Sequence, residues 1–387
     1  MTPTSLYLHI PFCAHRCAYC DFNTYAGQED SIPAYVEALG REIRAVAGSS
    51  PERLGVHTVF FGGGTPSLLN AAQFETIFES IRASFDLTAD AEISLEANPG
   101  TLSFVYLQDL HSLGFNRLSL GVQSAHPDEL HLLERIHDYF DVVEAVAWAR
   151  RAGFDNVNLD LIFGLPEQTL ERWRSTVKLV LGLKPEHLSL YALTLEHGTP
   201  FGRWAAQGLL PLPDPDAAAD MYEWSEDALD AAGYGHYEIS NWALPGRECL
   251  HNLQYWRNLN YLGLGAGAHG YAARVRYSNV LRIKTYVDRC AAGAAARFPL
   301  SPAVVNSHRP TVREEMQETM ITGLRLTREG VSASAFRERF GVTLTEAFGT
   351  EIESLAGFGL LEWSGDRLRL TVRGRLLGNQ VFVRFVD

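Results

Sequence analysis

The chain has few cysteines, no long hydrophobic run and a deficit of basic residues. Its five cysteines are an odd number, so a disulfide framework is not expected, and a reducing cytoplasm suits free thiols. No stretch approaches the roughly 18 uninterrupted apolar residues of a membrane-spanning helix. The amino terminus, MTPTSLYLHIPF, has no basic region ahead of a long apolar one. We therefore expect neither export nor direct membrane insertion.

The charge balance argues against nucleic acid as a partner. With 33 Lys and Arg against 46 Asp and Glu, the net charge is -13, which repels phosphates. No run of Lys or Arg interleaved with aromatic residues opposes this field. The 387 residues are 46% hydrophobic and 11% aromatic, which predicts a globular protein with a packed core.

Three of the five cysteines form a C-x3-C-x2-C cluster near the amino terminus, in HIPFCAHRCAYCDF: Cys13, Cys17 and Cys20. Three thiolates this close can converge on one metal centre. Structural zinc sites and most iron-sulfur clusters take four protein ligands, so three leave a position open for a substrate or cofactor. We favour a redox 4Fe-4S cluster, whose open iron could be chelated by the amino and carboxylate groups of S-adenosylmethionine.

Zinc is the alternative metal for this cysteine loop. Its fourth ligand would come from the neighbouring side chains: His9, His15 or Asp21.

Six short β-rich runs alternate with helical stretches and predict an α/β fold. The runs show little clean alternation of polar and apolar residues, which favours parallel strands covered on both faces. Six units are too few for a closed eight-stranded barrel, so we predict a partial (β/α)6 barrel, with a doubly wound sheet as the alternative. The runs lie at 6–12, 58–64, 92–98, 117–123, 157–164 and 187–194.

Polar residues and glycines cluster at the carboxyl ends of these runs, where such folds bind ligands. The GGGTP turn could bring backbone N–H groups close to an anion, although a tight turn explains its glycines equally well. A structural role is also open for each of the others, but their coincidence around one rim favours a binding site. They are Gly62 to Thr65, Glu96, Asn98, Gln123, Asp160 and Tyr191.

The remaining chain predicts an irregular segment at about 195–300, appended to a barrel domain of 1–300, and a small second domain at 301–387. Helical stretches and the strand pair LLEWSGDRLRLT around a Gly-Asp turn predict a winged-helix-like α+β domain. Its 11 arginines are balanced by 11 acidic residues, with no lysine. We therefore interpret it as a packing or interaction module rather than a DNA-binding one.

Together the cysteine cluster, GGGTP, LEANPGT, NRLSLGVQS, NLDLIFGLP and HNLQYW make the chain resemble radical-SAM proteins of the oxygen-independent coproporphyrinogen III oxidase family over nearly its full length. Within that family it looks most like the HemW branch of haem chaperones. Phe22 stands where the oxidases have another cysteine, only twelve residues precede Cys13, and HNLQYW matches the H-N-x-x-Y-W pattern of that branch.

The resemblance implies a haem chaperone with a 4Fe-4S cluster on Cys13, Cys17 and Cys20. Haem b would be transferred to haem-requiring, respiratory proteins, and a coproporphyrinogen III oxidase in porphyrin biosynthesis is the alternative. The sequence leaves open whether S-adenosylmethionine is cleaved, which protein accepts haem, and whether subunits pair as a homodimer. The implied S-adenosylmethionine-binding residues are Tyr7, Gly63, Gly64, Thr65, Glu96, Gln123, Arg135 and Asp160.

The implied haem ligand is His251, because neutral imidazole is a common axial ligand to haem iron and the nearby Tyr255 and Trp256 could cover a porphyrin face. A packed, hydrogen-bonded histidine is the structural alternative. Cys249 and His269 are further candidates for the ligand.

Overall fold

The computed structural model describes residues 4–386, which form two compact units. The first unit comprises the chain up to Ser225 together with Asn260–His308, and the second comprises Glu226–Leu259 and the chain from Arg309 onward. The expected boundary at residue 300 thus lies inside the first unit. The second unit also contains a segment that we expected in the barrel domain.

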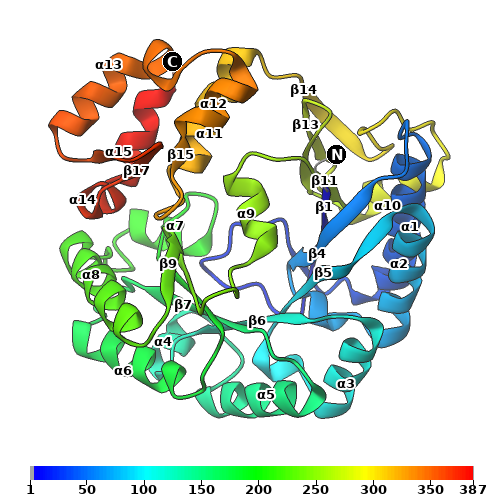
Figure 1. The fold of residues 1–387 in the computed structure, drawn as a ribbon. Coiled ribbons are helices and arrows are strands. Elements are labelled where there is room, and N and C mark those ends of the chain that lie inside the picture. The colour runs from blue at the N-terminus through cyan, green and yellow to red at the C-terminus, as the bar shows by residue number, and fades with distance from the viewer. Residues whose placement is uncertain (1–3, 387) are drawn as a thin grey trace. The chain divides into compact units, whose positions relative to one another are not determined.

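The first unit is built on six parallel strands that pair in chain order, from blue to green in Figure 1, and the predicted partial barrel is confirmed. They are β1 (Thr4–Ile10), β4 (Gly55–Gly63), β5 (Asp86–Ala97), β6 (Arg117–Gln123), β7 (Val157–Phe163) and β8 (His187–Ala192). The connecting helices are α1 (Ile32–Gly48), α2 (Ala71–Ser84), α3 (Phe104–Leu113), α4 (Pro127–Leu132), α5 (Tyr139–Ala152) and α6 (Leu170–Leu181).

The barrel sheet continues beyond β1, where irregular structure was expected. β11 (Tyr261–Leu264) pairs in parallel with β1, and three antiparallel strands follow. These are β12 (His269–Ala272), β13 (Val275–Asn279) and β14 (Val304–His308). The remaining elements are β2 (Phe12–Cys13), β3 (Tyr25–Ala26), α7 (Pro200–Ala206), α8 (Pro215–Ala231), which crosses the division between the units, and α10 (Ile283–Ala291), with 3-10 turns at Glu29–Ser31, Pro66–Leu68 and Pro99–Thr101.

The barrel strands do alternate, and our expectation of little alternation is wrong. In β7, Leu159 and Leu161 are fully buried, while Asn158 and Asp160, which alternate with them, are hydrogen-bonded to each other and to Ser119 of β6. Because side chains of neighbouring strands meet only on a shared face, these polar residues line the barrel interior. The leucines lie on the opposite face, which the helices cover. The lumen is therefore polar.

The second unit has a winged-helix-like core, as predicted. β15 (Val331–Ser332), β17 (Arg367–Leu370) and β16 (Leu361–Ser364) form an antiparallel sheet in that order. Its helices are α9 (Leu250–Trp256), α11 (Val312–Gly323), α12 (Ala333–Phe340), α13 (Leu344–Gly357), α14 (Val372–Leu376) and α15 (Gly378–Phe382), with a hairpin of β9 (Gly235–Glu238) and β10 (Asn241–Ala243) and a 3-10 turn at Val383–Phe385.

Capping boxes begin two of the helices in the second unit. Thr311 and Glu314 cap α11, and Thr343 and Glu346 cap α13. In the part of the chain that the structure describes, no helix combines the length and apolar character needed to cross a bilayer.

Candidate functional site

The three clustered cysteines lie on one loop at the carboxyl end of β1. Cys13 ends the short strand β2 and is buried, whereas Cys17 and Cys20 are partly exposed. The Cys20 N–H donates to the Cys17 carbonyl oxygen at 3.1 Å, so the two residues share a tight turn. β2 pairs in parallel with β3, which closes the loop back onto itself.

The GGGTP turn packs directly on this cysteine loop. The N–H groups of Gly64 and Thr65 donate to the carbonyl oxygens of Ile10 and Phe12 at 2.9 and 2.7 Å. A Cβ atom on Gly64 would lie 2.5 Å from the Phe12 oxygen. Gly63 has a φ of 115°, a value that favours glycine. Glycine is therefore required here because the two backbones approach so closely.

A continuous set of side-chain contacts joins the turn to the cysteines. The Thr65 hydroxyl donates to Cys13 Sγ at 3.7 Å and accepts from Asn98 Nδ2 at 3.1 Å. Arg135 donates to Asn98 Oδ1 and, through Nη1, to Cys17 Sγ at 3.6 Å. Asn98 was noted at the rim but not among the binding residues. The geometry places it at the centre of this arrangement.

Two carboxyl groups face the lumen below the turn. Glu96 Oε2 accepts the Gly63 N–H at 3.0 Å, and burial together with the charge of Asp160 raises the pKa of Glu96 to about 7. Burial also raises the pKa of Asp160. The Tyr7 hydroxyl contacts His9 Nδ1 at 3.0 Å, and burial and the nearby Glu96 raise the Tyr7 pKa. Glu96 therefore interacts electrostatically with both Tyr7 and Asp160.

Gln123 ends β6 in the left-handed region, with a φ of 68°. Gly121, two residues earlier, lets two side chains approach the strand, since a Cβ atom there would lie 2.9 Å from Gln123 Nε2 and 3.1 Å from Arg135 Nη2. The barrel end thus brings together the predicted residues of the first unit. Tyr191, also predicted at the rim, is 43% exposed.

The residues present fit a sulfur-bound iron cluster beside an anionic ligand. Three soft thiol donors share one loop, two of them accept hydrogen bonds from neighbouring side chains, and Arg135 supplies a positive charge. Arg135 Nε is buried and has no hydrogen-bond partner within the described residues. Across residues 4–386, however, no three His, Cys, Asp or Glu side chains are already grouped as a metal site.

Two of the three alternative zinc ligands contact other groups. His9 uses Nδ1 for Tyr7 and Nε2 for the Asn23 carbonyl oxygen at 2.9 Å. His15 Nε2 lies 3.3 Å from Glu134 Oε2. His9 therefore has no spare ring nitrogen for zinc, and His15 and Asp21 are exposed.

The predicted haem ligand lies in the second unit, on α9. His251 is 1% exposed, and its Nε2 is 2.7 Å from the Tyr255 hydroxyl, with the two rings perpendicular at 4.9 Å. Trp256 packs with Tyr237 and Leu253 beneath the Arg325 guanidinium, which lies 4.4 Å from the ring centre. Trp256 is thus a packing residue here.

The other two haem-ligand candidates are placed differently. Cys249 is buried at the N-cap of α9, and His269 is exposed on β12 of the first unit.

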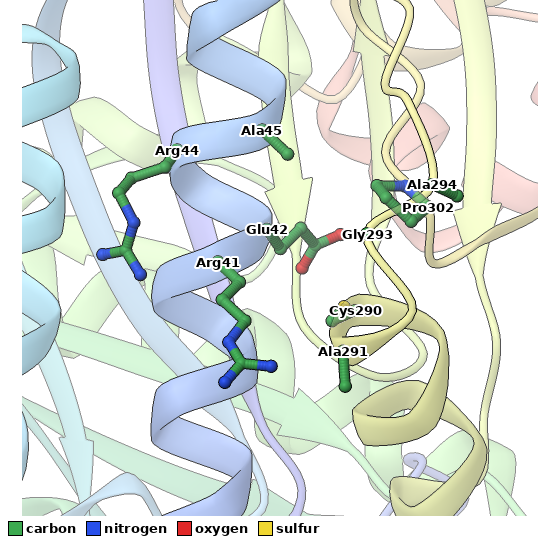
Figure 2. Close-up of a pocket in the computed structure, with 9 residues that line it drawn as sticks. All are labelled: Arg41, Glu42, Arg44, Ala45, Cys290, Ala291, Gly293, Ala294 and Pro302. Atoms are coloured by element: carbon green, nitrogen blue, oxygen red, sulfur yellow. The ribbon is translucent and has the colours of Figure 1, made fainter.

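A cavity of about 450 Å³ lies between α1 and residues 290–302, and none of the residues that line it is a predicted binding residue (Figure 2). Glu42 points into this region, whereas Arg44 points away from it. The Glu42 carboxyl already accepts four hydrogen bonds from protein groups. The cavity therefore offers a ligand no free acidic group.

The parallel barrel, the three-cysteine loop at the end of its first strand and the winged-helix-like unit define a radical-SAM protein. A Radical SAM superfamily model matches residues 7–180, and a HemN C-terminal domain model matches 311–377. The protein named Heme chaperone HemW of Bacillus subtilis is 41% identical over 384 residues, 99% of each chain. Its namesake from Escherichia coli is 42% identical over 275 residues, 70% of each. The chain belongs to the HemW family.

The fold also matches a solved relative. Coproporphyrinogen III oxidase (HemN) from Escherichia coli, described as a radical SAM enzyme, superposes with a TM-score of 0.84 at 27% identity. The match covers 99% of this chain and 90% of that one.

Proposed function

We propose that this protein is a haem chaperone whose cysteines Cys13, Cys17 and Cys20 hold a 4Fe-4S cluster, and that it binds haem b and transfers it to haem-requiring acceptor proteins. The observation that carries the cluster assignment is the unbroken contact path from Cys13 through Thr65, Asn98 and Arg135 to Cys17. The haem assignment is supported by the near-full-length similarity to proteins named HemW.

S-adenosylmethionine would bind on the GGGTP side of this path. Gly63 and Gly64 would present backbone to its methionine part, and the free Nε edge of Arg135 would pair with its carboxylate. Glu96 and Asp160 would accept hydrogen bonds from its ribose hydroxyls. The remaining proposed contacts are Tyr7, Thr65 and Gln123. When bound and reduced, the cluster supplies the electron that radical-SAM chemistry requires.

Haem would be ligated by His251 after a local opening of α9. Its Nε2 is held by Tyr255, so iron has to displace that hydrogen bond. The helix has seven residues and no side-chain N-cap, and such short helices open easily.

Haem titration of the cluster-reconstituted protein, read by the Soret band under anaerobic conditions, tests this assignment. We expect His251→Ala to weaken haem binding by at least about tenfold, the equivalent of roughly 1.4 kcal/mol. His236→Ala is the matched control, because His236 is also buried in the second unit, stacked on Trp242 at 4.1 Å. Equal binding by both variants would remove His251 from the proposal.

Iron and sulfide content tests the cluster. Cys17→Ser should lose the brown chromophore, whereas Cys290→Ser, a change at a buried cysteine of α10, should retain it. A Cys17→Ser protein with full iron and sulfide would contradict the ligand assignment.

The second candidate function is oxygen-independent coproporphyrinogen III oxidation, which the structural match to HemN favours. Product analysis separates the two. An oxidase forms deoxyadenosine and protoporphyrinogen from coproporphyrinogen III and S-adenosylmethionine, whereas a chaperone binds haem stoichiometrically without decarboxylated product.

A further inference from the structure

A one-way chain of hydrogen bonds runs over three adjacent strands, β8, β7 and β6, and ends on Asp160 of β7. His187 Nδ1 lies 2.6 Å from Asn158 Oδ1, and the Ser189 hydroxyl donates to the same oxygen at 3.2 Å. Asn158 Nδ2 donates to Ser119 Oγ at 2.7 Å and to Asp160 Oδ1 at 2.8 Å. The Ser119 hydroxyl donates in turn to Asp160 Oδ2 at 3.0 Å.

The direction of this chain is set by chemistry. Burial lowers the pKa of His187 well below its usual value, so its imidazole is neutral. Asn158 turns its NH₂ group to the Asp160 carboxylate, so its Oδ1 faces His187, and the neutral imidazole must carry its proton on Nδ1 to donate to that oxygen. Both oxygens of Asp160 receive a donor, which holds the carboxylate as an acceptor in one orientation.

We infer that Asn158 is a positioning residue that keeps the Asp160 carboxylate ionised and oriented toward S-adenosylmethionine. This inference rests on the proposed function, in which Asp160 accepts hydrogen bonds from the ribose hydroxyls. Asn158 itself is 1% exposed and lies one layer deeper in the lumen.

The surroundings of Asp160 make this support necessary. Burial raises its pKa, and hydrogen bonds from Asn158 and Ser119 and the charge of Arg117 oppose that shift, as does the Ser189 hydroxyl when its single proton is directed to Asp160 rather than to Asn158. Other charged or titratable groups on lumen-facing positions include Glu92 and Glu96 of β5, His187 of β8, and Tyr7 and His9 of β1. Removing the Asn158 donor would therefore favour the protonated acid, because the remaining environment disfavours charge.

Asn158→Leu is the test, since leucine is similar in size but donates nothing. S-adenosylmethionine affinity would be measured by equilibrium binding to the reconstituted protein from about pH 6 to about pH 9, a range that brackets a raised carboxyl pKa. Protonation of S-adenosylmethionine itself changes both Kd values equally, so the ratio of the variant Kd to the wild-type Kd is independent of it. We expect a ratio of about ten near neutral pH, equivalent to one hydrogen bond to a charged group. It should fall toward one at alkaline pH.

Thr58→Val is the matched control. Thr58 is buried in the same lumen and donates to Ser5 Oγ at 2.6 Å, outside the Asp160 chain, so its ratio should stay near one throughout. Retained iron content would show that the cluster is intact in both variants.

A ratio for Asn158→Leu that is raised equally at every pH would mean that Asn158 only supports the fold, and a ratio near one would mean that it does nothing for the site. Either result would overturn the inference. Failure of the wild-type protein to bind S-adenosylmethionine would instead overturn the proposed function, and this inference with it.

Discussion

Replacing Glu42 with alanine would remove an acceptor on which several parts of the first unit converge. The side chain projects from α1, is 1% exposed, and lines the cavity in Figure 2. Its carboxyl accepts hydrogen bonds of 2.6–2.8 Å from four donors: the Gly265 N–H, Asn279 Nδ2, the Tyr286 hydroxyl and the Ser301 hydroxyl. These donors come from distant parts of the chain, so Glu42 links α1 to the segment that extends the barrel sheet.

The expected loss of stability in Glu42→Ala follows from the four buried donors that would no longer have an acceptor. A buried donor without an acceptor costs about 1–3 kcal/mol, so four cost about 4 kcal/mol even at the lower limit. A typical domain is stable by only about 5–15 kcal/mol. Glu42→Gln should lose about half as much, because its amide oxygen still accepts two of the four hydrogen bonds.

Guanidinium denaturation followed by circular dichroism would measure these changes in the free energy of unfolding. Glu37→Ala on the same helix is the control, because Glu37 pairs with Arg41 at the surface, where such a pair contributes less than about 1 kcal/mol. A Glu42→Ala protein within about 1 kcal/mol of the wild type would refute the reasoning, since the four donors would then have to find other partners.

Two further substitutions address the binding site itself. Burial raises the pKa of Glu96 from 4.5 to about 7, so its stabilising contribution is complete below about pH 4.5 and is lost as the pH rises through 7. Glu96→Gln still accepts the Gly63 N–H and should make the free energy of unfolding less pH-dependent. At pH values above 7, the variant should be more stable than the wild type by at most about 3 kcal/mol. Denaturation at several pH values would measure both effects. Gly64→Ala would press Cβ on the Phe12 oxygen and should reduce S-adenosylmethionine binding and cluster content, whereas Gly48→Ala, with open space around it, should bind normally.

The barrel could be predicted because its strands and its cysteine motif are contiguous in the sequence. In β5, the run ISLEA gives a buried strand, and its period of two places Ser94 and Glu96 inside while Leu95 lies beneath the helices. The alternation is obscured in β4, which has two adjacent phenylalanines and three glycines. A closer count of the Leu-polar-Leu steps in the later strands would have predicted the polar lumen.

The contacts that assemble the site could not be predicted in the same way. Arg135 meets Asn98 across 37 positions of sequence and Cys17 across 118. No local pattern carries that information, because such contacts depend on how the strand ends converge in the folded barrel. The same reason explains why we expected 226–259 in the barrel domain. Its helix and hairpin belong to the second unit because they pack on residues that lie far away in the sequence.

His251 Nε2 forms a hydrogen bond with Tyr255 in the structure, and haem iron would need the same nitrogen. Residues at i and i+4 face the same side of a helix, so His251 and Tyr255 were expected to be neighbours, and they are. The hydrogen bond between them satisfies a buried imidazole, but a haem iron needs that same Nε2. Trp256 packs beneath Arg325 at the end of α9, so we expect opening to begin at the amino-terminal turn, where the Cys249 side chain forms no capping hydrogen bond. Haem affinity should therefore depend on the free energy of opening this turn as well as on the bond between iron and nitrogen.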